Sequence, residues 1–205
     1  PKSHIANRKS QLTYPAMKPK SIFLFLVAVM ITSQIINPRS SGNAVVDQLL
    51  AAWSPRNFTS EPVTDQQLDL ILQCGIKAPS ARNNQPWRFT VIRDEVTMKE
   101  IIGNVVPGNV LILVSGVESK EGRTPDFDCG LAAQNMFIAA TSLGLGARIY
   151  GGPSGAANAK REALQVPAGY KIVVILRVGN IDKSVDAVSA ASTRKKADEI
   201  VNYKK

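Results

Sequence analysis

Histidine is almost absent from this chain: among 205 residues only His4 is one, and it stands close to the first residue. Zinc sites and Ser-His-Asp triads use histidine as a ligand or a base, so the sequence favours neither, and we expect no metal site. Cysteine is nearly as scarce. Cys74 and Cys129 fall in apolar, helical stretches, where we expect two buried free thiols; one disulfide is the alternative if the protein is exported.

Acidic side chains are missing from residues 1–46, which hold six lysines and arginines. The whole chain has 25 basic and 16 acidic residues, a net charge of +9, so residues 47–205 keep 19 basic against 16 acidic residues, a net charge of +3. A nucleic-acid-binding protein would carry its basic patch on the folded part of the chain. The charge distribution therefore argues against nucleic acid as a partner.

The N-terminal segment also lacks a hydrophobic run long enough for a comfortable membrane span. Its apolar stretch covers residues 22–31, whereas a spanning helix takes about 20 residues. A basic stretch followed by a short apolar run is typical of a signal peptide or a short anchor. We therefore expect a dispensable tail, residues 1–42, that directs export or touches the membrane through residues 22–36. The alternative is a cytoplasmic protein in which that stretch is a helix packed on the body, residues 43–205.

The body has the length of one domain and alternates helical and strand patterns. The continuous apolar run at 109–115 predicts a strand covered on both faces, and Thr64 followed by Gln67 predicts a capping box. Few strands among many helices predict a single α+β domain. The apolar spacing predicts helices over 43–53, 64–78, 94–102, 126–146 and 156–165, and strands over 87–93, 109–115 and 170–179.

Residues 76–89, IKAPSARNNQPWRF, concentrate side-chain amides between a predicted helix and a predicted strand. A tight turn needs one asparagine or glycine, whereas Asn83, Asn84 and Gln85 stand together here. A carboxamide offers a donor and an acceptor side by side, which suits the edge of a flat heterocycle. The alternative is a polar turn that only caps the helix, but this would leave Gln85 and Trp87 unexplained.

Four further patterns follow one another along the body: SPRNF at 54–58, APSARNNQPWRF at 78–89, DCGLAAQNMFIAATSLGLG at 128–146 with YGG at 150–152, and TRKKADEIV at 193–201. Taken in order, these four stretches resemble the FMN-dependent nitroreductase family over roughly residues 44–202. The resemblance implies an α+β, nitroreductase-like fold: a central, mostly antiparallel sheet flanked by helices, in an intertwined homodimer that binds FMN. The body would then be the FMN-binding domain.

The resemblance also implies how the cofactor is held. Asn83 would hydrogen-bond the pyrimidine edge of the flavin ring, while Arg56 and Arg194 would bind the phosphate, since guanidinium meets phosphate bidentately. Ala52 stands where the family usually has a further arginine, so one phosphate cation is missing. The implied cofactor-binding residues are Ser54, Arg56, Pro79, Ser80, Asn83, Gln85, Gly151, Gly152 and Arg194, with no catalytic side chain because the flavin carries the chemistry.

The function implied is an oxidoreductase in which NADH or NADPH reduces FMN by hydride transfer and a nitroaromatic, quinone or similar small molecule accepts the electrons. The chain has no dinucleotide-binding fingerprint, so we expect donor and acceptor to use one site in turn, with ping-pong kinetics. One alternative is a flavin-dependent dehydrogenase or dehalogenase. Another is a flavin-binding interaction protein without turnover, which Ala52 and the tail would favour.

Overall fold

The computed structural model describes residues 41–118, 125–185 and 193–204. Residues 1–40, and with them the stretch at 22–36 expected to touch a membrane, lie outside the described residues, so export and anchoring stay predictions. Within the described ranges no helix is long and apolar enough to cross a bilayer. The elements are α2 (Ala44–Ala51), α3 (Asp65–Ile76), the 3₁₀ turn η1 (Ala81–Asn83), β1 (Trp87–Ile92), α4 (Glu95–Ile101), β2 (Val110–Val117), α5 (Pro125–Ser142), β3 (Gly146–Tyr150), α6 (Ser154–Ala159), β4 (Tyr170–Gly179) and α7 (Ala197–Ile200).

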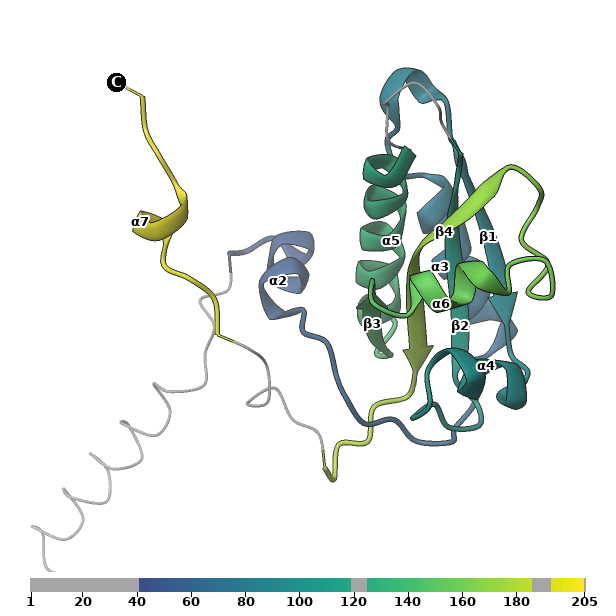
Figure 1. The fold of residues 1–205 in the computed structure, drawn as a ribbon. Coiled ribbons are helices and arrows are strands. Elements are labelled where there is room, and N and C mark those ends of the chain that lie inside the picture. Colours follow the sequence, from purple (N-terminus) through teal and green to yellow (C-terminus); the bar gives the residue numbers. More distant parts are fainter. Residues whose placement is uncertain (1–40, 119–124, 186–192, 205) are drawn as a thin grey trace, which may run out of the picture. The chain divides into compact units, whose positions relative to one another are not determined.

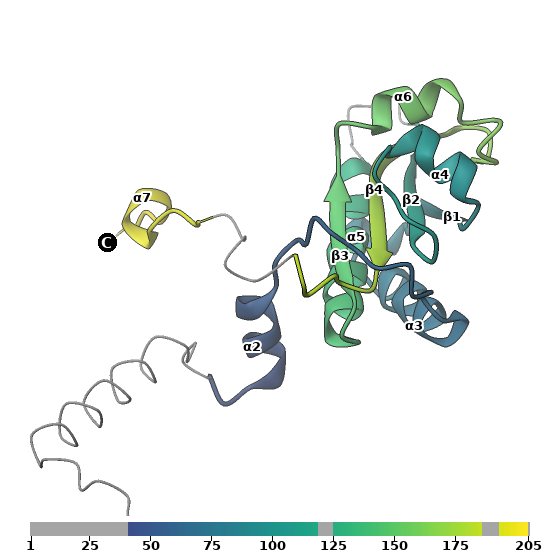
Figure 2. The same ribbon diagram turned by 90° about the horizontal axis from the view of Figure 1, so that it is seen from below.

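A four-stranded antiparallel sheet in the order β1-β2-β4-β3 forms the centre of the body (Figure 1). Seven of the eight residues of β2 are buried, which confirms the strand expected to be covered on both faces. Alternation assigns its side chains to two cores: Ile112 packs with α3 and α5, and Leu111 packs with α4 and α6. Figure 2 shows the sheet between these helix layers, so the expected α+β architecture is confirmed.

Helix α3 begins as its sequence predicts. Thr64 accepts a hydrogen bond from the Gln67 backbone N–H, and the Gln67 side chain accepts one from the Thr64 backbone, which completes the capping box. The buried residues of α3 are Leu68, Ile71 and Gly75, and this stripe turns the helix toward α5.

Strand β3 is an element that the sequence patterns do not predict, since the expected strands are those at 87–93, 109–115 and 170–179. Helix α5 ends at Ser142, and Gly144 then takes a left-handed conformation with φ of 79°, which reverses the chain. The reversal brings Gly146 opposite Gly179, and five residues pair with β4. The five residues of β3 include glycine and arginine and show no clear alternation of apolar and polar side chains. The strand is stabilised by its pairing with β4, which the local sequence does not reveal.

The two cysteines differ in environment, and both are free thiols. Cys129 is buried in the core between α5 and the sheet, as expected. The expected burial of Cys74 is wrong: the core-facing stripe of α3 passes through Ile71 and Gly75, so Cys74 lies on the exposed flank. Burial, together with the nearby carboxylates of Asp126 and Asp128, raises the pKa of the Cys129 thiol to about 12.

Gly75 of α3 packs directly against Met136 of α5. A Cβ there would lie 2.7 Å from Cγ and 2.8 Å from Sδ of the buried Met136. We predict that Gly75→Ala lowers the free energy of unfolding by about 1–3 kcal/mol, because a well-packed core resists an added methyl group. Gly130→Ala is the matched control: its Cβ meets open space in α5, so the better helix former should add about 0.5–1 kcal/mol. Urea unfolding of the two variants measures both changes, and a Gly75→Ala protein as stable as the parent would contradict the packing.

We predict that one thiol of the native protein reacts with a disulfide reagent at pH 8 and that the second reacts only after unfolding. The thiolate is the reactive form, and a raised pKa keeps Cys129 protonated at that pH while its burial blocks access. Counting thiols before and after adding denaturant gives the measurement. Cys74→Ser should abolish the fast reaction; a remaining fast thiol in that variant would show that Cys129 is accessible.

Candidate active site

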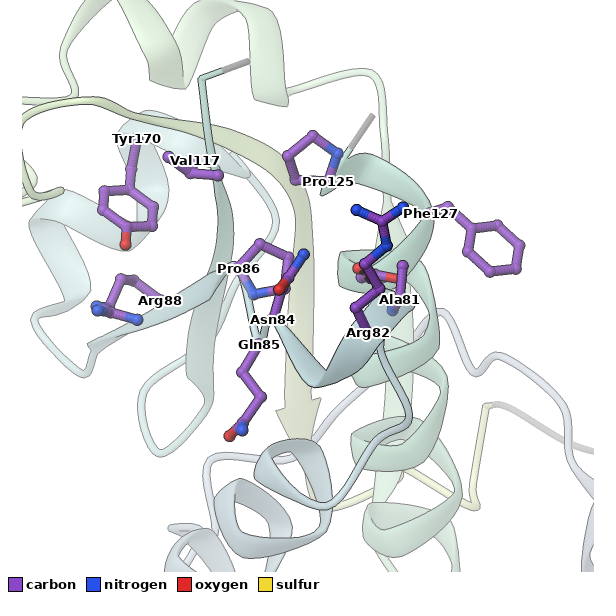
Figure 3. A pocket seen from close by; sticks show the side chains of 11 residues that line it. Ala81, Arg82, Asn84, Gln85, Pro86, Arg88, Val117, Pro125, Phe127 and Tyr170 are labelled. Carbon is purple, nitrogen blue, oxygen red and sulfur yellow. Dashed lines mark hydrogen bonds between the residues drawn. The ribbon is translucent and has the colours of Figure 1, made fainter. Parts of the chain in front are cut away.

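A cavity of about 550 Å³ opens at the end of the sheet where β1 begins, β2 ends and β4 begins (Figure 3). Its size falls within the range of small-molecule sites. The walls come from the loop before β1, the first turn of α5 and the sheet end. The lining residues are Ala81, Arg82, Asn84, Gln85, Pro86, Arg88, Val117, Pro125, Phe127, Asp128 and Tyr170.

The loop that borders the cavity, residues 79–86, has a strained backbone. Arg82, Asn83 and Gln85 all have positive φ, at 54°, 56° and 46°. For side chains other than glycine the left-handed conformation costs roughly 1–2 kcal/mol per residue, so it persists only where surrounding contacts fix it. The Asn83 backbone N–H donates to Ser80 O at 3.0 Å, and the Gln85 N–H donates to Ser80 Oγ at 3.1 Å. The Gln85 amide also donates to Asn83 Oδ1 at 3.2 Å.

Asp128 joins this loop to helix α5. Its side chain is buried with only 6% exposed, and both carboxylate oxygens accept the Ala81 backbone N–H, at 3.2 and 3.3 Å. The neighbouring Asp126 instead pairs with Lys171 Nζ at 2.9 Å. Asp128 is not among the residues expected from the sequence to form the site, although an acidic residue in the first turn of an apolar helix is a signal that could single it out.

Two arginines give the cavity a positive rim. Figure 3 shows Arg82 and Arg88 on opposite sides of the opening. Arg88 donates to Trp87 O at 2.8 Å and lies over the Tyr170 ring, 5.1 Å from its centroid, as in a cation–π contact. Arg82 is exposed, and among the residues that the structure describes it makes no hydrogen bond or ion pair. Flat ligands with negative charge are therefore favoured at this opening.

The structure groups some of the residues expected to bind the cofactor. Pro79, Ser80, Asn83 and Gln85 share the strained loop, and Gln85 also lines the cavity. Gly151 and Gly152 form the turn after β3. A Cβ at either glycine would meet open space, so packing within the chain does not require glycine there. We expect their small size to matter for a group from outside the chain.

Ser54 and Arg56 lie at the other end of the sheet. Pro55, between them, reaches Gly146, where a Cβ would lie 2.6 Å from Pro55 Cγ. Gly146 pairs with Gly179 at the end of β4, whereas Lys171, near its start, pairs with Gly116 at the cavity end. The eight residue steps from Lys171 to Gly179 cover roughly 26 Å at 3.3 Å per step.

A single chain therefore does not bring these phosphate-binding candidates to its own loop. Arg194 is exposed and precedes α7, in the described range 193–204.

A family model for the nitroreductase family matches residues 49–107 and 107–180. Among curated relatives, an NADPH-flavin oxidoreductase of Vibrio harveyi is 28% identical over 162 residues, 69% of this chain and 68% of that protein. A protein of Archaeoglobus fulgidus, described as an NADH dehydrogenase/NAD(P)H nitroreductase, is 29% identical over 137 residues, 62% of this chain and 79% of its own.

Solved structures give the same result. A protein of Desulfovibrio desulfuricans, described as a nitroreductase in complex with FMN, is 32% identical, with a TM-score of 0.68 over 80% of this chain and 98% of its own. A nitroreductase of Bacteroides fragilis with bound FMN shares the fold at 23% identity, with a TM-score of 0.63 over 79% of this chain and all of its own. This chain belongs to the nitroreductase family.

Proposed function

We propose that the protein is an FMN-dependent oxidoreductase that uses NADH or NADPH to reduce nitroaromatics, quinones or similar small molecules. Family membership supports the proposal, as does the fold shared with a 32% identical protein in complex with FMN. The observation that carries it is the loop at 79–86, whose strained backbone presents side-chain amides at the mouth of a cavity. Strained backbone of this kind persists where surrounding contacts fix it, and it clusters at ligand-binding and catalytic sites.

The residues present fit FMN by their chemistry. The loop offers amides for the hydrogen-bonding edge of a flavin ring, and Arg56 and Arg194 offer guanidinium groups for a phosphate. When bound, FMN would supply the centre that takes hydride from the nicotinamide and passes electrons to the acceptor.

The chain's own side chains would bind and orient the reactants. The Arg88–Tyr170 pair forms a flat, cationic wall, and Phe127, 71% exposed on α5, adds an apolar face to the same cavity. The positive rim would attract the phosphates of NADH or NADPH. Because the sequence has no dinucleotide-binding fingerprint that would hold the nicotinamide elsewhere, donor and acceptor would occupy this cavity in succession.

We also infer that the active form is a homodimer with two FMN sites, each built from the loop of one chain and the phosphate-binding residues of the other. The arrangement is supported by the position of Ser54 and Arg56, which lie at the opposite end of the sheet from the loop, roughly 26 Å apart as measured along β4. Helix α2 supports it too: none of its residues is buried, and Val45, Leu49 and Leu50 are 65%, 50% and 70% exposed. A second copy could cover this apolar surface in an interface above roughly 2,000 Å².

The absorption spectrum of the purified protein tests the function. We expect a flavin band at roughly 450 nm that bleaches when NADH or NADPH is added without oxygen, followed by recovery when an acceptor is added. Double-reciprocal initial-rate plots should be parallel, because one site serves both substrates. A protein that takes up no FMN would overturn the proposal, and a yellow protein that neither nucleotide bleaches would favour flavin binding without turnover.

We predict that Arg56→Ala weakens FMN binding about ten- to a hundredfold, since a hydrogen bond to a charged group contributes roughly 1.5–3 kcal/mol. Arg194→Ala should have an effect of similar size. Equilibrium dialysis measures each affinity. Ala52→Arg serves as the converse variant: it should tighten binding, because it returns a cation to the phosphate site.

The same variants test the shared site by complementation. When Arg56→Ala and Asn83→Ala chains are unfolded together and refolded, each mixed dimer should regain one site of parental affinity, built from the intact residue of each chain. If mixing restores no tight site, or if the protein sediments as a monomer with FMN bound, the intersubunit arrangement is wrong.

A further inference from the structure

The loop at 79–86 depends on one side chain from outside it. Apart from Asp128, no side chain in the described part of the chain beyond the loop hydrogen-bonds to residues 79–86. At the end of the loop, the Val117 backbone N–H donates to Pro86 O at 3.1 Å and ties that residue to β2. The remaining bonds run between Ser80, Ala81, Asn83, Asn84 and Gln85, all close in sequence. These local bonds give the loop its shape, whereas the Asp128 bond ties the start of η1 to helix α5.

Asp128 is well placed for this because its own helix is firmly held. It precedes Cys129, which is fully buried, and Ala132 and Met136 follow on the same core-facing stripe of α5. Its carboxylate meets Ala81, the residue at which η1 begins, directly before the left-handed Arg82 and Asn83. Figure 3 shows Ala81 beside the first turns of α5. A buried carboxylate bound to a backbone N–H is a charge-assisted contact, stronger than a neutral hydrogen bond.

We propose that Asp128 is a positioning residue for the cofactor site: by holding the Ala81 N–H it sets the place of Asn83 and Gln85 against the flavin ring. The identity of the ligand rests on the function proposed above. Asp128 acts through the loop and touches no reacting atom. Its loss should therefore weaken recognition of the ring while leaving recognition of the phosphate intact.

Asp126 provides a matched control for charge. It lies in the same first turn of α5, so its removal takes away the same charge from the same helix end. Asp126 pairs with Lys171, and within the described residues it makes no hydrogen bond to the loop. A general electrostatic effect would therefore appear in both variants, and a positioning effect only in the Asp128 variant. Asp128→Asn is the conservative variant, since an amide keeps one oxygen that can accept the Ala81 N–H.

Binding of riboflavin and of FMN by the whole chain separates ring from phosphate. We expect Asp128→Ala to weaken the binding of riboflavin and of FMN by the same factor, about tenfold. Asp128→Asn should recover most of the lost affinity, and Asp126→Ala should leave both affinities unchanged. Arg56→Ala should weaken FMN alone, because riboflavin has no phosphate. Ala81→Pro removes the backbone N–H at the other end of the same bond, so it should weaken flavin binding by the same factor as Asp128→Ala. It therefore keeps the proposal testable if the Asp128→Ala protein folds poorly.

A second readout needs no flavin. Arg82 is exposed within the loop, so trypsin can cut after it, and a loosened loop should be cut about tenfold faster in Asp128→Ala but not in Asp126→Ala. If cutting accelerates and the parent binds no flavin, the loop-holding role stands and the proposed function falls. If the parent binds riboflavin and Asp128→Ala binds it equally well, or if Asp126→Ala loses as much affinity, the positioning role of Asp128 is overturned.

Discussion

Strands β2 and β4 pair antiparallel at eight positions, and most of the side chains on both faces of this pair are buried. Two buried faces need two covering layers, which α3 with α5 and α4 with α6 supply. Because the faces are occupied by helices, the exposed connections lie at the two ends of the sheet. The loop at 79–86 lies at one end and residues 54–58 lie at the other, so the central strand pair also decides where functional groups can be.

The candidate site combines a rigid support with a strained loop. Helix α5 packs on the sheet through Ala132 and Met136, and its first turn carries the carboxylate that reaches Ala81. The loop can then keep a left-handed conformation at Arg82, which a side chain of that kind rarely adopts, next to the left-handed Asn83. Pre-organised groups lose little freedom when a ligand binds, which is the physical benefit of such strain.

Much of the fold could be predicted from local patterns, and much of the site's geometry could not. The apolar run that became β2 and the Thr64–Gln67 capping box carry their own signals, because burial on both faces and helix capping are written in neighbouring residues. Strand β3 gave no such signal, since its pairing with β4 makes it a strand. The Asp128–Ala81 bond joins residues 47 positions apart, and no spacing rule predicts it. The roles expected for Asn83 and the two phosphate-binding arginines stay predictions.

The order of elements along the chain has a consequence for synthesis. Strand β2 ends at Val117 and its central partner β4 ends at Gly179, so 62 residues must be added before the pair can close along its whole length. At about 5–20 residues per second this takes roughly 3–12 seconds. During that interval the nascent chain presents an uncharged, β-branched strand with one edge unpaired, which is the kind of segment that associates with other chains. Strand β1 is already made and can shield the other edge through its antiparallel pairing. Nascent chains on closely spaced ribosomes of one mRNA would therefore be prone to aggregate through this strand.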